Sequence, residues 1–228
     1  MNLVSVEHLS LTIGRAPILN DVSFAIAPGE VFGLVGESGS GKSMTSLALM
    51  GLLPEGAALS GRALWTRSGQ AGEGGSMPPP PAPLDLLAQP DAAMCRLRGR
   101  EIGMIFQEPM TALNPVKTIG DQVAETLIVH GTPRAEATRI ARERLDRVGL
   151  TADRFPMDRF PHELSGGQRQ RVCIAMAVAL RPRLLIADEP TTALDVTTQA
   201  QILALLKELV AEEGMALLLI THDLAVVA

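Results

Sequence analysis

The sequence predicts an α/β fold that combines a parallel sheet with an antiparallel β portion at the start of the chain and an inserted helical subdomain. Three observations predict it. Short apolar runs at residues 31–35, 184–187 and 215–220 are typical of strands buried on both faces of a parallel sheet. A glycine-rich stretch connects the first run to a segment expected to be helical. An apolar stripe with helical spacing marks residues 121–149.

The glycine-rich stretch matches the pattern G-x-x-x-x-G-K-[ST], which binds phosphate when a strand precedes it and a helix follows. We expect that strand over residues 31–35 and that helix over residues 43–50. Main-chain N–H groups of such a loop surround the phosphates, the lysine reaches the β- and γ-phosphates, and the last hydroxyl ligates Mg²⁺. A turn without a ligand is the weaker alternative, because the flanking strand and helix are both in place. The residues assigned to this phosphate loop are Gly36, Glu37, Ser38, Gly39, Ser40, Gly41, Lys42 and Ser43.

Two carboxylates follow the second apolar run. Asp188 ends the expected strand, where α/β folds place their ligands, so we expect it to hold Mg²⁺ through water. Glu189 comes next and is close enough to polarise an attacking water. The pair could instead cap the following helix, but Asp195 is the better candidate for that cap. It directly precedes a helix expected over residues 196–213, which Gly214 would end.

Two further polar residues come directly after expected strands. The strand over residues 215–220 leads to His222, at the same sheet edge as Asp188, where a neutral imidazole could contact a γ-phosphate and orient water. Gln107 follows a strand expected over residues 102–106, and its amide can bind both metal and water. Either residue alone indicates little, since a single histidine is more often structural. The neighbouring motifs make the functional reading the stronger one.

A second glycine pair lies within residues 164–168, which read Leu-Ser-Gly-Gly-Gln. Gly166 and Gly167 leave the backbone open to an anion, and Ser165 adds a hydroxyl. A helix is expected over residues 168–180, and its N-terminus carries partial positive charge. This signature segment (residues 164–168) is therefore a second phosphate-binding surface. Two such surfaces in one domain predict that two chains clamp the nucleotide between them.

These motifs, in this order and over nearly the whole chain, resemble the ATP-binding subunit of an ABC transporter. Residues 36–43, 107–115 and 160–164 are similar to the branch that imports oligopeptides, dipeptides and nickel. The resemblance implies a P-loop NTPase core of the ABC ATPase type that binds ATP and Mg²⁺. It implies that Glu189 is the general base, that His222 is the γ-phosphate switch and that Gln107 is the sensor. It also implies that phosphate and metal are bound by Lys42, Ser43 and Asp188. The ATP of the other subunit would be contacted by Ser165, Gly166, Gly167 and Gln168. Asp195 would lie at the dimer interface.

The function implied by the resemblance is that of an ATPase that powers an importer for peptides or nickel. The implied partners are a second ATPase subunit, identical or different, a transmembrane permease and, indirectly, an extracytoplasmic substrate-binding protein. A soluble ABC-type ATPase of DNA repair or translation is an alternative, although such proteins typically carry long coiled-coil insertions that this chain lacks. A non-catalytic nucleotide-binding subunit is another alternative, which the intact Glu189 and His222 oppose.

Two departures from the family pattern concern the adenine and the C-terminus. Residues 9–14 contain no aromatic to stack on adenine, and Ile13 is expected to give an apolar contact in that place. The chain ends at Ala228, soon after His222, where the family continues into further strands and helices. We expect either a fragment or a natively short protein, so that the C-terminal part of the family fold is missing.

Composition narrows the cellular setting. A net charge of −5 argues against non-specific nucleic-acid binding. The longest apolar run, residues 172–180, is much shorter than the ~18 residues of a membrane span. No signal peptide is recognisable at the start, so we expect a cytoplasmic protein that reaches the inner face of the membrane through the permease. Cys95 and Cys173 are expected to be reduced thiols, with Cys173 packed in a helix.

The positions of the motifs predict the domain organisation. Residues 1–93 and 165–228 are expected to form the nucleotide-binding α/β core, and residues 94–164 the helical subdomain. Residues 68–83 are rich in Gly, Ser and Pro and predict a flexible surface insertion. In the helical part, Thr132 is expected to cap a helix that begins at Pro133, with a basic run on its solvated face. That run consists of Arg139, Arg142, Arg144 and Arg147.

Overall fold

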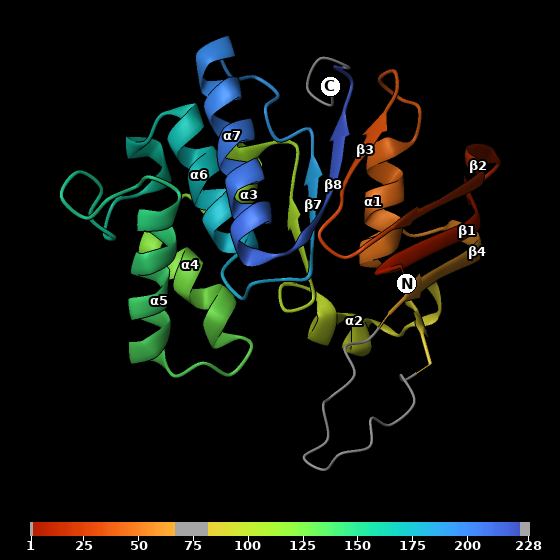
Figure 1. The fold of residues 1–228 in the computed structure, drawn as a ribbon, viewed down its shortest axis with the longest axis horizontal. Coiled ribbons are helices and arrows are strands. Elements are labelled where there is room, and N and C mark those ends of the chain that lie inside the picture. Colours follow the sequence, from red (N-terminus) through yellow and green to blue (C-terminus); the bar gives the residue numbers. More distant parts are fainter. Residues whose placement is uncertain (1, 67–81, 224–228) are drawn as a thin grey trace.

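The computed structural model describes residues 2–66 and 82–223 of the 228-residue chain, and Figure 1 shows its arrangement. Two sheets lie side by side, one antiparallel and one parallel. Of the surface insertion predicted at residues 68–83, only Ala82 and Pro83 fall within the described residues, and both are exposed. The α/β fold with an N-terminal antiparallel portion is therefore confirmed.

The antiparallel sheet has the strand order β2-β1-β4-β5. Its strands are β1 (Val4–Ile13), β2 (Ala16–Ile26), β4 (Ala57–Trp65) and β5 (Leu84–Asp85). Strand β1 continues past the apolar residues at the start of the chain. A bulge at His8, whose φ is 52°, interrupts the alternation of side chains, so the strand cannot be followed from that alternation alone. Strand β4 carries no clear signal in the sequence, since most of its residues are exposed.

The parallel sheet has the strand order β3-β8-β7-β6. It comprises β3 (Val31–Val35), β6 (Ile102–Ile105), β7 (Leu184–Asp188) and β8 (Ala216–Thr221). Every residue of β7 and β8 is buried, because both faces of the sheet are covered. The three apolar runs thus form strands as predicted, within one residue of the expected bounds at each end.

Helices cover both faces of the parallel sheet. The α-helices are α1 (Lys42–Met50), α2 (Asp91–Leu97), α3 (Pro109–Ala112), α4 (Ile119–Ile128), α5 (Arg134–Arg147), α6 (Gly166–Ala177) and α7 (Val196–Glu213), and short 3-10 helices lie at Leu86–Ala88 and Pro161–Glu163. Among the described residues, no helix combines the length and the apolar character needed to cross a membrane.

Three predicted helix ends can be compared with the structure. Helix α7 has the predicted bounds, with Asp195 as its N-cap and Gly214 as its C-cap. The expected cap at Thr132 is wrong, because its N–H donates back to Leu127 in the turn after α4, and Pro133 takes the cap position of α5. Helix α6 starts two residues earlier than expected, at Gly166, since the side chain of Ser165 already caps it.

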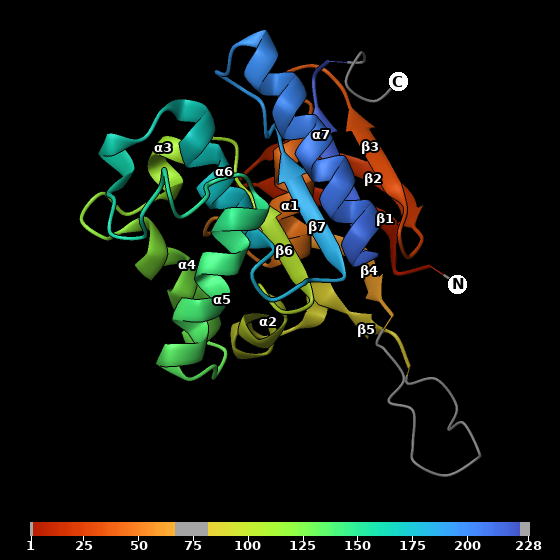
Figure 2. The same cartoon turned by 60° about the vertical axis from the view of Figure 1, so that its left-hand side comes forward.

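Two buried clusters share the parallel sheet between them. Along β7, Leu184 and Ile186 pack into a cluster with α1 and the antiparallel sheet, whereas Leu185 and Ala187 pack into a cluster with helices α4 to α7. Figures 1 and 2 accordingly show α1 on one side of this sheet and α6 and α7 on the other. The sheet therefore separates the helix that follows the phosphate loop from the helix that follows the signature segment.

The basic run of α5 differs from the prediction at Arg144. Its side chain is buried and lies 2.7 Å from the Glu213 carboxylate at the end of α7. Arg139, by contrast, is exposed and pairs with Glu143 on the same helix. The run is thus a solvated face only in part, because one of its cations joins two helices that are distant in sequence.

Candidate functional site

Gly41 lies where the phosphate loop enters helix α1, in a backbone conformation that requires glycine. Gly41 has φ 93° at the N-cap of α1, and a Cβ atom there would lie 2.5 Å from the Leu19 side chain. The Lys42 ammonium is turned into the loop, where Nζ donates to the carbonyl oxygens of Gly36 at 2.7 Å and Glu37 at 2.8 Å. Buried against two carbonyl dipoles, this cation is held where an anion would enter.

Asp188 and Ser43 meet at the start of α1. The Ser43 hydroxyl donates to Oδ1 of Asp188 at 3.0 Å, across 145 positions of sequence. Asp188 is only 4% exposed. Burial raises the pKa of its carboxyl above the ordinary range, while the bond from Ser43 opposes that shift. A hydroxyl and a carboxylate oxygen thus lie together beside the phosphate loop, as predicted.

Glu189 is the point at which three strand ends and the following turn converge. Its side chain is 12% exposed, and three side chains contact its Oε2 atom. Thr192 Oγ1 donates to it at 2.9 Å and Gln107 Nε2 at 3.3 Å, and His222 Nδ1 lies 3.3 Å away within ion-pair distance. The structure therefore brings together the predicted residues Glu189, Gln107 and His222. The contact from Thr192 was not predicted, because a threonine three residues after a glutamate carries no recognisable signal.

A cavity of about 310 Å³ lies between the phosphate loop and Glu189. Figure 1 shows this loop beside the ends of β3, β7 and β8, which point to the same edge of the sheet. Ile18 and Met44 give the cavity apolar walls, whereas Ile13 is not among its lining residues. The lining residues are Ile18, Ser38, Gly39, Gly41, Lys42, Ser43, Met44, Gln107 and Glu189.

The signature segment caps its own helix. Ser165 Oγ accepts a hydrogen bond from the Gln168 N–H at 3.3 Å, and Gln168 Oε1 accepts one from the Ser165 N–H at 2.9 Å. Gly166 is exposed, whereas a Cβ atom on Gly167 would lie 2.5 Å from Cγ2 of Thr198 on α7. Gly167 is therefore required by helix packing, in addition to the openness that its sequence context predicts.

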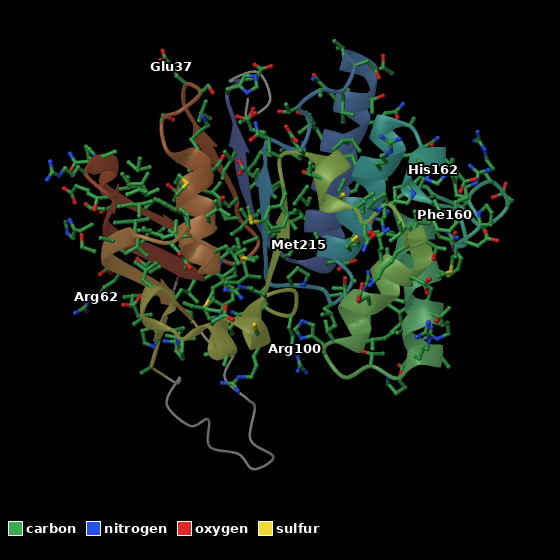
Figure 3. All side chains as sticks on the ribbon, turned by 180° about the vertical axis from the view of Figure 1, so that it is seen from behind. Glu37, Arg62, Arg100, Phe160, His162 and Met215 are labelled. Carbon is green, nitrogen blue, oxygen red and sulfur yellow. The ribbon has the colours of Figure 1, made fainter. Side chains whose placement is uncertain are left out.

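The two surfaces predicted to bind phosphate do not meet within the part of the chain that the structure describes. Residues 165–168 are absent from the lining of the phosphate-loop cavity. Figure 3 shows Glu37, in the phosphate loop, and His162, just before the signature segment, on opposite sides of the molecule. Contact between the two surfaces therefore requires a second chain or a large rearrangement of this one.

Asp195 acts as the helix cap that the sequence predicts. Its Oδ1 accepts from the Thr198 N–H at 3.0 Å, and its Oδ2 accepts from the Thr198 hydroxyl at 2.7 Å. These bonds, above all the one from the hydroxyl, lower the pKa of the Asp195 carboxyl. The carboxylate is exposed, so it also remains accessible to a partner.

Comparison with known proteins shows which family the chain belongs to. Residues 19–192 match a family described as ABC transporter, and the chain belongs to that family. It is 54% identical over 211 residues to a putative peptide import ATP-binding protein of Brucella melitensis, covering 92% of this chain and 60% of the relative. It is 47% identical over 231 residues to the oligopeptide transport ATP-binding protein OppD of Salmonella typhimurium, covering 99% of this chain and 64% of the relative. The chain thus spans about three-fifths of the length of these curated relatives.

A solved structure gives the same fold. The ATP-binding cassette MJ0796, in a dimeric post-hydrolysis state bound to ADP and Pi, aligns with a TM-score of 0.78 and 30% identity. The alignment covers 98% of this chain and 89% of the MJ0796 chain. The predicted ABC ATPase fold is therefore confirmed.

Proposed function

We propose that this chain is the ATP-binding and ATP-hydrolysing subunit of an ABC importer for peptides. The observation that carries the proposal is the Glu189 carboxylate, which lines the phosphate-loop cavity and is held there by side chains from three other segments. The names of the relatives favour peptides over nickel, which the sequence alone left open.

ATP would bind through the phosphate loop. In the structure the Lys42 ammonium donates hydrogen bonds to two loop carbonyls. A polyphosphate offers a full negative charge in place of those dipoles, so Lys42 would exchange them for the β- and γ-phosphates. The loop N–H groups at the start of α1 would complete the phosphate contacts. Ile18 and Met44 would supply apolar contact at the mouth of the cavity, where no aromatic is available.

The residues present fit a magnesium ion. Magnesium prefers oxygen ligands and is usually bound by one or two protein groups together with substrate phosphates. The hydroxyl of Ser43 and the carboxylate of Asp188, 3.0 Å apart, are such a pair, and Gln107 lines the same cavity. When bound, the ion would neutralise charge on the phosphate oxygens.

Hydrolysis requires a water positioned on the γ-phosphorus and a base for its proton. We assign the base to Glu189. As the water oxygen bonds to phosphorus, the carboxylate takes the proton, and the bond from the γ-phosphorus to the bridging oxygen breaks with its electron pair going to ADP. His222 and Gln107, which already contact Glu189, would orient the water and contact the γ-phosphate.

The partners follow from the separation of the two surfaces. Residues 165–168 would contact ATP bound by a second ATPase subunit, and Asp195 would lie at that interface. Residues 1–93 and 165–228 would form the nucleotide-binding core, and residues 94–164 the helical part that faces the permease. The chain would then lie on the inner face of the membrane, attached through the permease, with an extracytoplasmic binding protein supplying the peptide.

Capture of the complex tests this proposal. The tagged full chain, isolated from membranes in mild detergent, should bring down a permease and an ATPase subunit, and vesicles containing the complex should take up labelled peptide only with ATP. Lys42→Ala should be captured with the same partners but should not support uptake. Recovery without any membrane protein would favour a soluble ABC-type ATPase instead.

A further inference from the structure

We propose that Thr192 is a positioning residue for hydrolysis, which fixes the Glu189 carboxylate so that Oε1 receives the proton of the attacking water. The inference rests on the proposed function, in which Glu189 is the base. The three contacts of the carboxylate are all made to Oε2, from Thr192, Gln107 and His222. Within the described residues, no hydrogen bond to Oε1 is present, and we assign this oxygen to the attacking water.

The backbone of Glu189 is held in an uncommon conformation. Its φ is 46°, in the left-handed region that residues with a side chain rarely adopt. Two hydrogen bonds hold it there, from its own N–H to Ile220 O at 2.9 Å and from the Thr192 N–H to Glu189 O at 3.1 Å. Such a conformation persists only where the surroundings fix it. Thr192 therefore contacts Glu189 twice, once through the backbone and once through the side chain.

The hydroxyl contact differs from the other two in length and exposure. The distance from Thr192 Oγ1 to Oε2 is 2.9 Å, against 3.3 Å for both nitrogen atoms, Gln107 Nε2 and His222 Nδ1. Thr192 is half-buried, whereas the His222 side chain is 59% exposed and Gln107 is exposed as well. Threonine is also stiff at χ1, so its hydroxyl is held in place at little further entropic cost. Of the three groups that contact Oε2, the Thr192 hydroxyl is the one best suited to fix the carboxylate.

The position of Thr192 is set by α7 and not by the nucleotide. The amide of Gln199 on α7 donates to Thr191 O at 3.2 Å and to Leu194 O at 3.1 Å, which holds the turn from both sides of Thr192. Gln107, in contrast, lines the cavity, and in the proposed function both it and His222 turn to the phosphate and water. Thr192 is then the donor that stays on Glu189 when ATP is bound.

The test is Thr192→Val, which removes the hydroxyl and keeps the branched shape. In the full chain, kcat for ATP hydrolysis should fall about tenfold, which is the loss expected for one hydrogen bond to a charged group, while KM for ATP is unchanged. Thr192→Ser should restore the rate. Thr191→Val is the matched control, because the backbone of Thr191 takes part in the turn and, among the described residues, its hydroxyl makes no hydrogen bond. If Thr192→Val does not fold, Thr192→Ala removes the same hydroxyl and is read in the same way.

A second measurement separates this inference from the proposed function. In a Glu189→Gln background, Thr192→Val should cause no further loss, because both changes disable one unit. A wild-type kcat for Thr192→Val beside an inactive Glu189→Gln would overturn the inference alone. An equal loss in Thr191→Val, or no rescue by serine, would also overturn it. Wild-type turnover by Glu189→Gln would instead refute the assignment of the base, and with it the proposed function.

Discussion

The N-termini of α1 and α6 are both glycine-rich and both suited to phosphate, yet their surroundings differ. At α1, no side chain caps the helix, and Lys42, Asp188 and Glu189 are gathered around it. At α6, Ser165 and Gln168 cap each other. The first surface therefore holds the groups that the proposed hydrolysis needs, whereas the second would contribute only to binding. In the proposed function, hydrolysis would then depend on the contact that brings the signature segment of another subunit to the cavity.

The largest effect should come from Lys42→Ala. Loss of the ammonium removes the charge that faces the β- and γ-phosphates, so phosphate release should fall by about 10³-fold. Lys207→Ala is the matched control, because Lys207 is an exposed cation on the outer face of α7. Undiminished turnover in Lys42→Ala would show that the phosphate loop does not bind the phosphates that are hydrolysed.

Glu189→Gln should lower turnover by about 10²-fold and retain ATP binding, because an amide cannot accept the proton of water. With hydrolysis blocked, ATP should hold two subunits together, and a dimer should accumulate that light scattering can measure. A variant that binds ATP but stays monomeric in the presence of its partner would show that the two surfaces do not share one nucleotide.

Ser165→Arg tests the second surface directly. A bulky cation at the exposed N-terminus of α6 should block approach of the other subunit and lower turnover by roughly tenfold or more, with nucleotide binding by the phosphate loop unchanged. Ser165→Ala is the control, since it loses the same helix cap without adding bulk. Wild-type rates in Ser165→Arg would mean that the signature segment is not used.

The smallest effect concerns the packing of α6. Gly167→Ala should lower the free energy of unfolding by about 1–3 kcal/mol, because the new methyl meets Thr198, which Asp195 prevents from rotating away. Gly166→Ala is the control, as its methyl would lie 3.5 Å from Leu194, an ordinary contact. Both variants gain similar helix propensity, so the difference in urea midpoints measures the clash. Equal midpoints would show that Gly167 is needed only for phosphate.

Local signals in the sequence predicted most of the elements. The helix α7 could be bounded from Asp195 and Gly214, because caps and stops act within a few residues. The start of α6 was misjudged because the Ser165 side chain caps the helix two residues earlier than expected. The cap of α5 was misjudged because the Thr132 N–H donates to Leu127 O in the preceding turn. Strand β4 was missed because its exposed residues carry no apolar alternation.

The candidate site, too, was predicted from the sequence only in part. The motifs predicted that Asp188, Glu189 and His222 would lie at one sheet edge, since parallel strands end together. They did not predict which oxygen of Glu189 would be occupied, or that Thr192 would contribute a donor. Such details depend on side-chain rotamers and turn geometry, which no spacing rule encodes.

The sequence by itself was enough to predict a chemistry for each loop, because glycine, lysine and carboxylates at fixed spacing have few other uses. The tertiary structure alone decided how the loops relate. It placed α1 and α6 on opposite sides of one sheet, buried Arg144 against Glu213, and packed Gly167 against Thr198. These pairs lie far apart or on different elements, and burial of apolar surface on both faces of the sheet brings them together.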